Sequence, residues 1–175
     1  MINKLIRLYL KFKYGKRITI GKSVLISRLP SIVIGSSGHI SIANDTVIKS
    51  NCDFRAYDNS SIVIGAGCKI DDGVRIIAAN GQNVILGNNV KLGFYSVLNG
   101  GGGIKIGRDS STYGFVYIQS SSHSVSESNT FDKQGYKHLA ITIEENCLIQ
   151  PHCCIMPGSV IKAKSIIPAH TVIEC

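Results

Sequence analysis

The sequence predicts an all-β solenoid, in which short strands wind around a triangular core. The first observation is an apolar repeat of six residues, because neither an α-helix, with a period near 3.6, nor a flat strand, with a period of about 2, produces that spacing. Such a repeat is typical of β-solenoids, whose strands stack coil upon coil. Through the last third of the chain isoleucine recurs at every sixth position, at Ile143, Ile149, Ile155, Ile161, Ile167 and Ile173.

The same repeat runs through the earlier part of the chain once extra residues are allowed at the corners. The first members of successive apolar triplets lie 22, 22, 22 and 20 residues apart, whereas the step from Ile143 to Ile161 is 18 residues. About four residues therefore bulge from one corner of each early coil, and the turn-forming segments 58–61, 80–83 and 100–103 supply them. The triplets are Ile20/Ile26/(Ile32 or Ile34), Ile42/Ile48/Phe54, Ile64/Ile70/Ile76, Leu86/Leu92/Leu98 and Ile106/Thr112/Ile118.

A second position repeats four residues after each apolar anchor, where the chain nearly always has a small side chain. A tight coil has room for one large and one small inward side chain on each face, so two interlocking periods support the solenoid better than one. Glycine often follows the anchor, where the backbone must turn sharply. The small residues are Val24, Thr46, Cys52, Cys68, Val74, Val90, Ser96, Ser110, Val116, Cys147, Cys153, Ser159, Ser165 and Thr171.

These repeats resemble the hexapeptide-repeat acyltransferases, in the branch that contains the sugar and xenobiotic O-acetyltransferases. The family repeat has an aliphatic residue, then glycine or a polar residue, two variable positions and a small residue. The resemblance covers residues 18–175. It implies a left-handed parallel β-helix of triangular section that assembles as a homotrimer. We therefore expect a β-helix domain over residues 18–175, preceded by a helical segment within residues 1–17.

Residues 1–17 are strongly basic. Six of their side chains are Lys or Arg and none is acidic, whereas the remainder of the chain is close to neutral. A helix here can cap the open end of the solenoid, or it can lie on a membrane that carries anionic lipids, and both roles can hold together. Nucleic acid is not an expected partner, because the body has no basic stripe or aromatic platform. The apolar residues near one helix face are Ile2, Leu5, Ile6, Tyr9 and Phe12.

Composition favours one domain without a membrane-spanning segment. The chain has 175 residues, of which 44% are hydrophobic and 17% charged, and no apolar run approaches the roughly 18 residues that a membrane span requires. Four of the six cysteines, Cys52, Cys68, Cys147 and Cys153, occupy the small inward position, where a thiol acts as a compact hydrophobe. We expect free buried thiols and hence a cytoplasmic location, at the inner membrane face if residues 1–17 bind lipid.

The coil rhythm breaks once, between Ile118 and Ile143, where we expect a loop insertion over residues 119–142. A long excursion from a rigid scaffold is commonly functional. In the resembled acetyltransferases a histidine heads this loop, and the chain returns with a segment that ends in Pro-Gly. His123 and Pro157-Gly158 match these features. The resemblance implies that His123 is the general base for the attacking hydroxyl, a role that suits an imidazole titrating near neutral pH.

The resemblance also implies residues for the acceptor and for coenzyme A. Asn99 follows a Val-Leu pair one coil before the loop, as in related enzymes, and is expected to orient the acceptor or the base. Tyr136 and His138, near the loop exit, are expected to contact the acceptor sugar. Lys162 and Lys164, on the last coil, are expected to bind the phosphates of coenzyme A.

The sequence thus predicts an acetyl-CoA-dependent O-acetyltransferase that acts on a sugar hydroxyl in capsule, O-antigen or other surface-polysaccharide synthesis, without a metal. N-acetylation of an amino sugar and a non-catalytic β-helix scaffold stay open as alternatives. A γ-class carbonic anhydrase would need three histidines that converge on zinc. Only His123 and His138 lie near the loop, so that class is not expected.

Overall fold

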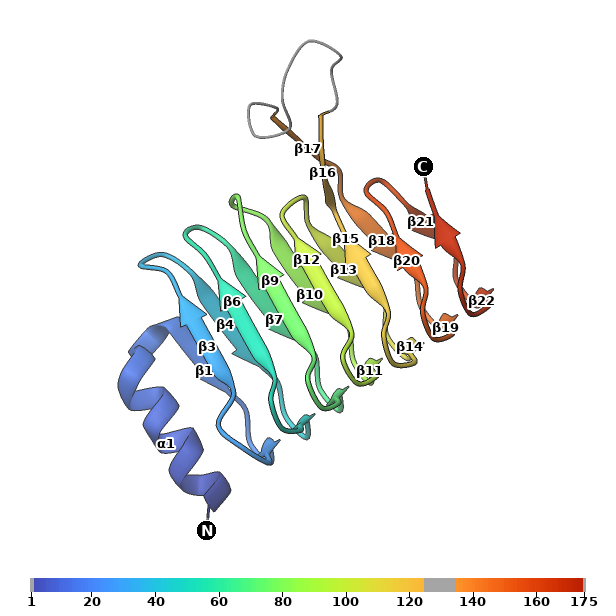
Figure 1. The fold of residues 1–175 in the computed structure, drawn as a ribbon. Coiled ribbons are helices and arrows are strands. Elements are labelled where there is room, and N and C mark those ends of the chain that lie inside the picture. The colour runs from blue at the N-terminus through green and yellow to red at the C-terminus, as the bar shows by residue number, and fades with distance from the viewer. Residues whose placement is uncertain (1, 125–134, 175) are drawn as a thin grey trace.

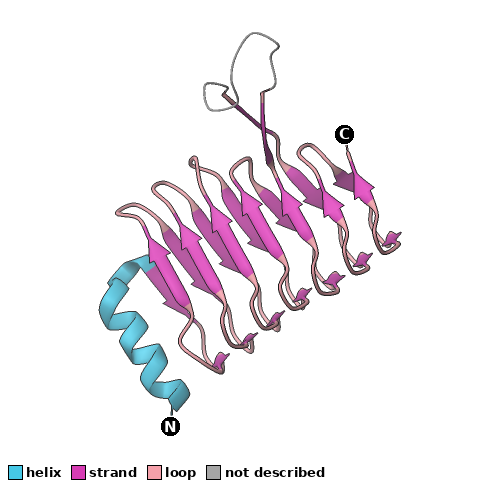
Figure 2. Ribbon diagram, in the orientation of Figure 1, coloured by secondary structure: helices cyan, strands magenta, loops and turns pink. Residues whose placement is uncertain are grey.

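The structure, a computed structural model, describes residues 2–124 and 135–174. Over these residues the chain forms a parallel β-solenoid of about seven coils, with one α-helix at its N-terminal end and one hairpin that leaves the body (Figures 1 and 2). The coils wind in the left-handed sense (Figure 1). The fold class predicted from the six-residue repeat is confirmed.

Three parallel sheets of seven strands form the faces of the solenoid, and each coil contributes one strand to each sheet. Sheet A contains β1 (Ile18–Ile20), β4 (His39–Ile42), β7 (Ser61–Ile64), β10 (Asn83–Leu86), β13 (Ile104–Ile106), β18 (Ile141–Ile143) and β21 (Val160–Ile161). Sheet B contains β2 (Leu25–Ile26), β5 (Val47–Ile48), β8 (Lys69–Ile70), β11 (Lys91–Leu92), β14 (Ser111–Thr112), β19 (Leu148–Ile149) and β22 (Ile166–Ile167). Sheet C contains β3 (Ser31–Ile34), β6 (Asp53–Ala56), β9 (Arg75–Ala78), β12 (Val97–Gly100), β15 (Tyr117–Gln119), β20 (Cys154–Ile155) and β23 (Val172–Ile173).

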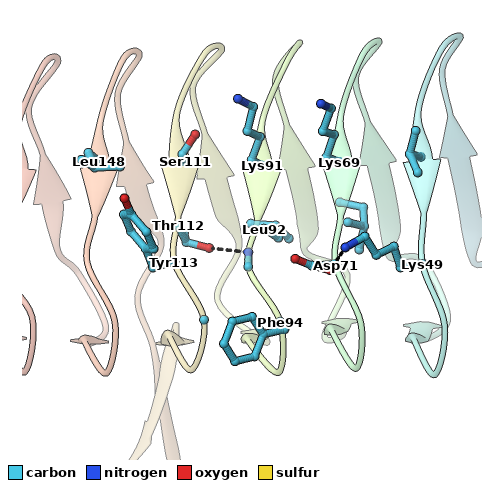
Figure 3. A pocket seen from close by; sticks show the side chains of 14 residues that line it. Lys49, Lys69, Asp71, Lys91, Leu92, Phe94, Ser111, Thr112, Tyr113 and Leu148 are labelled. Carbon is cyan, nitrogen blue, oxygen red and sulfur yellow. Dashed lines mark hydrogen bonds and ion pairs between the residues drawn. The ribbon is translucent and has the colours of Figure 1, made fainter.

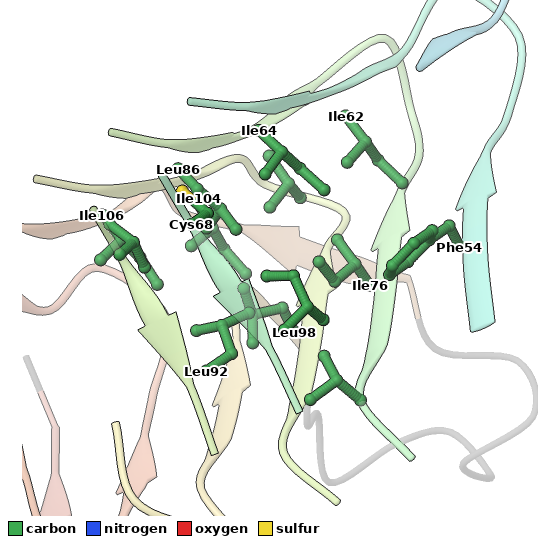
Figure 4. Close-up of a cluster of buried hydrophobic side chains, with 14 of the residues drawn as sticks. Phe54, Ile62, Ile64, Cys68, Ile76, Leu86, Leu92, Leu98, Ile104 and Ile106 are labelled. Carbon is green, nitrogen blue, oxygen red and sulfur yellow. The ribbon is translucent and has the colours of Figure 1, made fainter. Parts of the chain in front are cut away.

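The apolar anchors stack in register to form one continuous core. In sheet A, for example, Ile20 pairs with Ile42 and Ile42 with Ile64, and all three side chains are buried (Figure 4 shows the middle of this core). In the first coil Ile34 is buried and Ile32 packs against the core partly buried, so both alternatives of the first triplet face inward. Because stacking repeats every coil, the spacing of the anchors alone specifies the register.

Several of the small inward residues are polar and donate hydrogen bonds to carbonyl oxygens of the next coil. Thr46 Oγ1 donates a hydrogen bond to the Gly65 carbonyl oxygen at 3.0 Å, and Cys68 Sγ donates to the Gly87 carbonyl oxygen at 3.1 Å. A short hydroxyl or thiol thus satisfies a corner carbonyl from inside the core. The described cysteines are free thiols, and Cys52, Cys68, Cys147 and Cys153 are buried, as predicted.

Many corner residues have positive φ. Most of these positions hold Gly, Asn or Asp, which tolerate the left-handed region. Four successive coils instead place aromatic rings at one corner, with φ between 54° and 60°. Their rings form a ladder with centroids 5.8, 5.1 and 5.0 Å apart, and the stacking offsets part of the backbone strain. The ladder consists of Tyr95, Phe115, His152 and His170.

The helix α1 (Ile2–Tyr14), with the short 3-10 turn η1 (Gly15–Arg17), lies against the first coil (Figure 1). Leu10 and Tyr14 are buried there. The Asn3 side chain donates to the Val24 carbonyl oxygen at 3.0 Å and accepts from the Ile26 N–H at 2.9 Å. The helix therefore supplies hydrogen bonds to backbone groups at the edge of the first coil, which no preceding coil provides.

Within the described part of the chain, no helix has both the length and the apolar character needed to cross a membrane.

Candidate functional site

The loop insertion predicted between Ile118 and Ile143 projects from the corner between sheets C and A (Figure 1). Its described residues form an antiparallel hairpin of β16 (Ser121–His123) and β17 (Tyr136–His138). The hairpin pairs Ser121 with His138 and His123 with Tyr136. Residues 125–134 of the predicted insertion lie outside the described residues. The hairpin is the element that could present catalytic side chains above the rigid coils.

His123 lies at the outer end of this hairpin, and its side chain is exposed. Its ring centroid lies 4.3 Å from that of Tyr136, with the two planes tilted by 39°. Tyr136 in turn stacks on His138 at 6.0 Å and 13°. The three predicted residues of the loop therefore form one aromatic group along a single hairpin face.

His138 connects the hairpin to the solenoid. Its Nδ1 atom lies 2.8 Å from Ser121 Oγ, and its Nε2 atom lies 3.4 Å from the side-chain amide nitrogen of Asn80. Because an amide nitrogen only donates, this arrangement assigns the ring proton to Nδ1, which donates to Ser121. A Cβ on Gly101 would lie 2.5 Å from Ser121 Oγ, so glycine there leaves room for this contact.

Asn99 lies on sheet C below the hairpin. Its amide nitrogen donates to the Tyr117 hydroxyl at 2.9 Å and approaches Gln119 Oε1 at 3.4 Å. The Tyr117 hydroxyl also donates to Gln119 Oε1. Gln119 Nε2 then donates to the Ser121 carbonyl oxygen at 2.6 Å. This network reaches the first residue of the hairpin, whereas no hydrogen bond between the described side chains joins Asn99 to His123.

Several of these contacts involve residues that the sequence analysis did not single out. Asn80, Tyr117, Gln119 and Ser121 carry the connections between the coils and the hairpin. The sequence does contain a signal for Gln119. If the anchors Leu98 and Ile118 are neighbours in successive coils, then Gln119 must lie beside Asn99, as it does. For the others only the folded chain brings the partners together.

The two predicted coenzyme A residues lie beside a groove on sheet A. The groove has a volume of about 600 Å³ and includes Ala163, which lies between Lys162 and Lys164 in the chain. Glu144 forms an ion pair with Lys162 at 3.3 Å, and Glu145 forms one with Arg108 at 2.8 Å. The lysine ammonium at position 162 is thus partly neutralised by a carboxylate that an incoming phosphate would have to displace.

A second groove, of about 620 Å³, lies on sheet B, away from the corner where the hairpin leaves (Figure 3). Lys49 in this groove pairs with Asp71 at 2.6 Å. The hydrogen bond from Lys49 is the largest of the effects that lower the pKa of the Asp71 carboxyl. Lys69 and Lys91 follow one another along the same sheet, and the described carboxylates form no ion pair with them. This groove is the more cationic of the two.

Among the described residues, no group of three or more His, Cys, Asp or Glu side chains is arranged to hold a metal ion.

Comparisons with known proteins give the fold a context. No protein-family description and no curated sequence matches the chain. Among solved structures, a variant of the N-acyltransferase AntD from Bacillus cereus, in complex with dTDP and coenzyme A, aligns with a TM-score of 0.62. That alignment has 20% identity and covers 94% of this chain and 77% of AntD. A second AntD structure, with dTDP-4-amino-4,6-dideoxyglucose and coenzyme A, gives a TM-score of 0.58 at 19% identity over 96% and 78% of the two chains.

The polySia-specific acetyltransferase NeuO aligns with a TM-score of 0.59 at 16% identity, over 90% of this chain and 78% of NeuO. At such low identity these alignments show a common fold. The chain therefore shares the β-solenoid architecture of AntD and NeuO, as the hexapeptide-repeat resemblance implied.

Proposed function

We propose that the chain is a hexapeptide-repeat acyltransferase that moves an acetyl group from acetyl-CoA to a hydroxyl of a sugar. The observation that carries the proposal is the single interruption of the coils among the described residues. There the hairpin β16–β17 gathers His123, Tyr136 and His138 on one face, above the polar network of Asn99. The solved structures that share the fold support the same class of reaction, since AntD is described as an N-acyltransferase and NeuO as an acetyltransferase.

In the proposed reaction the Nε2 or Nδ1 lone pair of neutral His123 accepts the proton of the acceptor hydroxyl. The hydroxyl oxygen forms a bond to the acetyl carbonyl carbon, and the bond from that carbon to the sulfur of coenzyme A breaks. The proton held by His123 then returns to the departing sulfur, so the base is regenerated. General-base catalysis of this kind contributes about 10²–10⁴-fold, and alignment of the two substrates contributes much of the rest.

The other hairpin residues have different roles in this proposal. Tyr136, beside His123, offers a ring face to the sugar. His138 is a positioning residue, because its contacts with Ser121 and Asn80 hold the hairpin against the coils. Asn99 positions the foot of the hairpin through Gln119. Lys162 and Lys164 contact the phosphates of coenzyme A at the end of the sheet A groove.

Acylation of an amino sugar is the second candidate. AntD is an N-acyltransferase, and one of its structures holds a dTDP-linked 4-amino sugar together with coenzyme A. The same base can remove a proton from an attacking amine, so the chemistry of His123 does not separate the two.

A homotrimeric assembly, a cytoplasmic location and a surface polysaccharide as the destination of the sugar belong to the same proposal. The free buried thiols support the location.

The first experiment is calorimetric titration of the chain with acetyl-CoA, followed by transfer to a panel of sugars, amino sugars and nucleotide sugars. We expect about one site per chain and transfer that His123→Ala slows by about 10²–10⁴-fold. Mild alkali separates the two candidates, because it cleaves an O-acetyl ester and leaves an N-acetyl amide intact. Failure of the assembled protein to bind acetyl-CoA would overturn the proposal and leave the non-catalytic scaffold.

A further inference from the structure

The helix α1 has a second apolar face, which points away from the solenoid. Leu5, Leu8, Tyr9 and Phe12 are all exposed, and Phe12 is 91% exposed. At about 100° per residue these four side chains fall within one arc, nearly opposite the side on which Leu10 and Tyr14 are buried. A helix that only covers a solenoid end would be polar on its outer side. We call these four residues the outer face of α1.

Cationic side chains flank the outer face on both sides. Lys4 and Lys11 fall along one edge and Lys13 along the other, with the Lys13 ammonium 5.9 Å from the centre of the Tyr9 ring. The first turn of the helix has no acidic residue, and none occurs anywhere in residues 1–17. None of the salt bridges among the described residues involves this segment. The positive charge of the helix is therefore available to a partner.

A shallow groove runs beside one edge of the outer face. It has a volume of about 440 Å³ and is lined by Asn3, Lys4, Arg7, Leu8 and Lys11. Three cations and an amide around an apolar side chain suit a phosphate group attached to a hydrocarbon chain. Arg7 already donates one hydrogen bond to the Gly21 carbonyl oxygen, which fixes its position relative to the first coil.

From this arrangement we propose that the outer face of α1 docks on a lipid bilayer that carries anionic headgroups. Leu5, Leu8, Tyr9 and Phe12 would enter the boundary between headgroups and acyl chains, while the flanking lysines extend toward the phosphates. A second copy of the chain is the weaker occupant, because pairing two such helices would bring two cationic edges together with no carboxylate between them. The solenoid would then stand on the membrane by its N-terminal end, with the hairpin corner several coils away (Figure 1).

The apolar part of the proposal is tested by co-sedimentation of the full chain with vesicles. One preparation is pure phosphatidylcholine, and in the other about one lipid in three is phosphatidylglycerol. We expect binding to the anionic vesicles, and a decrease of at least about tenfold in the Leu8→Ser/Phe12→Ser variant. Val160→Ser/Ile166→Ser, which removes two exposed apolar side chains at the opposite end of the solenoid, should bind like the unmodified chain.

The electrostatic part is tested with Lys4→Gln/Lys11→Gln, whose matched control is Lys69→Gln/Lys91→Gln in the sheet B groove. We expect the first pair to weaken binding about tenfold and the second to leave it within about twofold, with binding decreasing as salt is raised. The substituted side chains are exposed, so each variant should unfold at the same temperature as the parent.

Three results would overturn the proposal. The first is an intact chain that does not bind anionic vesicles. The second is a lack of contrast in binding. The chain would bind both vesicle preparations equally, or the Leu8→Ser/Phe12→Ser variant would bind anionic vesicles as well as its parent does. The third is a self-association without lipid, measured by sedimentation velocity, that the Leu8/Phe12 variant abolishes. That third result would assign the outer face to a second copy of the chain.

Discussion

Nδ1 of His138 lies 2.8 Å from Oγ of Ser121, across the first pair of residues in the hairpin that leaves the solenoid. The other ring nitrogen of His138 reaches Asn80 on the coils. His123, by contrast, has its ring against Tyr136 at the outer end of the hairpin. The two histidines of the loop therefore differ in environment, and we expect them to differ in function.

His123→Ala should lower kcat by about 10²–10⁴-fold, because it removes the proposed general base. The affinity for acetyl-CoA should remain unchanged, and so should the unfolding temperature, since the side chain is exposed. Steady-state kinetics, together with calorimetry, measures both quantities. His39→Ala, at a half-buried histidine of β4 in the second coil, is the control. A variant at position 123 that keeps kcat within a few-fold of the parent would remove His123 from the mechanism.

His138→Ala should raise the KM for the acceptor by about tenfold, because it removes hydrogen bonds that hold the hairpin to the coils. The dissociation constant of acetyl-CoA should stay the same. His138→Asn should restore much of the loss, since its amide can donate to Ser121 as Nδ1 does. If kcat alone decreased and the Asn variant gave no recovery, His138 would act on the reacting atoms rather than by positioning.

Lys162→Gln/Lys164→Gln should raise the dissociation constant of acetyl-CoA about three- to tenfold, as expected for exposed charges near phosphates. Lys69→Gln/Lys91→Gln removes the same charge from the sheet B groove and should change the constant less than about twofold. Calorimetry at two salt concentrations compares the two variants. The opposite ranking would place coenzyme A in the groove of Figure 3.

Gly100→Ala should destabilise the fold by about 1–3 kcal/mol, because the new methyl group would clash with the Val84 side chain and lie 2.9 Å from the Ile77 carbonyl oxygen. The corresponding residues of the two preceding strands are Ala78 and Ala56, both buried. Urea unfolding of the single variants and of Gly100→Ala/Val84→Ala completes a double-mutant cycle. We expect the double variant to lose less unfolding free energy than the two single variants lose when their losses are added. Strict additivity would show that the two sites do not touch.

Stability should decrease in alkaline solution through the buried thiols. Burial raises the pKa of Cys52 from its ordinary 9.0 to about 11, and burial also raises the pKa of Cys68. Between pH 9.0 and about 11 the unfolded chain has released the Cys52 proton and the folded chain still holds it. The contribution of the protonated Cys52 thiol to the free energy of unfolding is therefore complete below pH 9.0, and it is lost as the pH rises toward 11.

The measurement is urea unfolding at several pH values across this window, for the unmodified chain and for Cys52→Ala. The variant should lose less stability between the ends of the window than its parent does. Cys154→Ala, at a half-buried cysteine, is the matched control. Identical pH profiles for the parent and Cys52→Ala would contradict the assignment.

The six-residue spacing was enough to predict the solenoid, its coil length and its inward residues. The reason is that each coil repeats the same short spacing, so that anchors such as Ile42 and Ile64 specify both the strand and its partner in the next coil. The same spacing located the interruption between Ile118 and Ile143, and it explains why Cys52 and Cys68 are buried thiols.

How the site residues contact one another could be read from the folded chain alone. Asn99 contacts Tyr117 and Gln119, and His138 contacts Ser121 and Asn80. These contacts depend on where the hairpin leaves its corner and on the side-chain rotamers, which no repeat encodes.

The two faces of α1 were likewise not separable in the sequence. Ile6 and Phe12 counted as one apolar face there, whereas in the folded chain Ile6 packs against the core and Phe12 faces outward. The first coil fixes the rotation of the helix through contacts such as Asn3 with Val24 and Ile26. A helical period alone says which residues share a face, and the surface against which the helix packs decides which of its faces is buried.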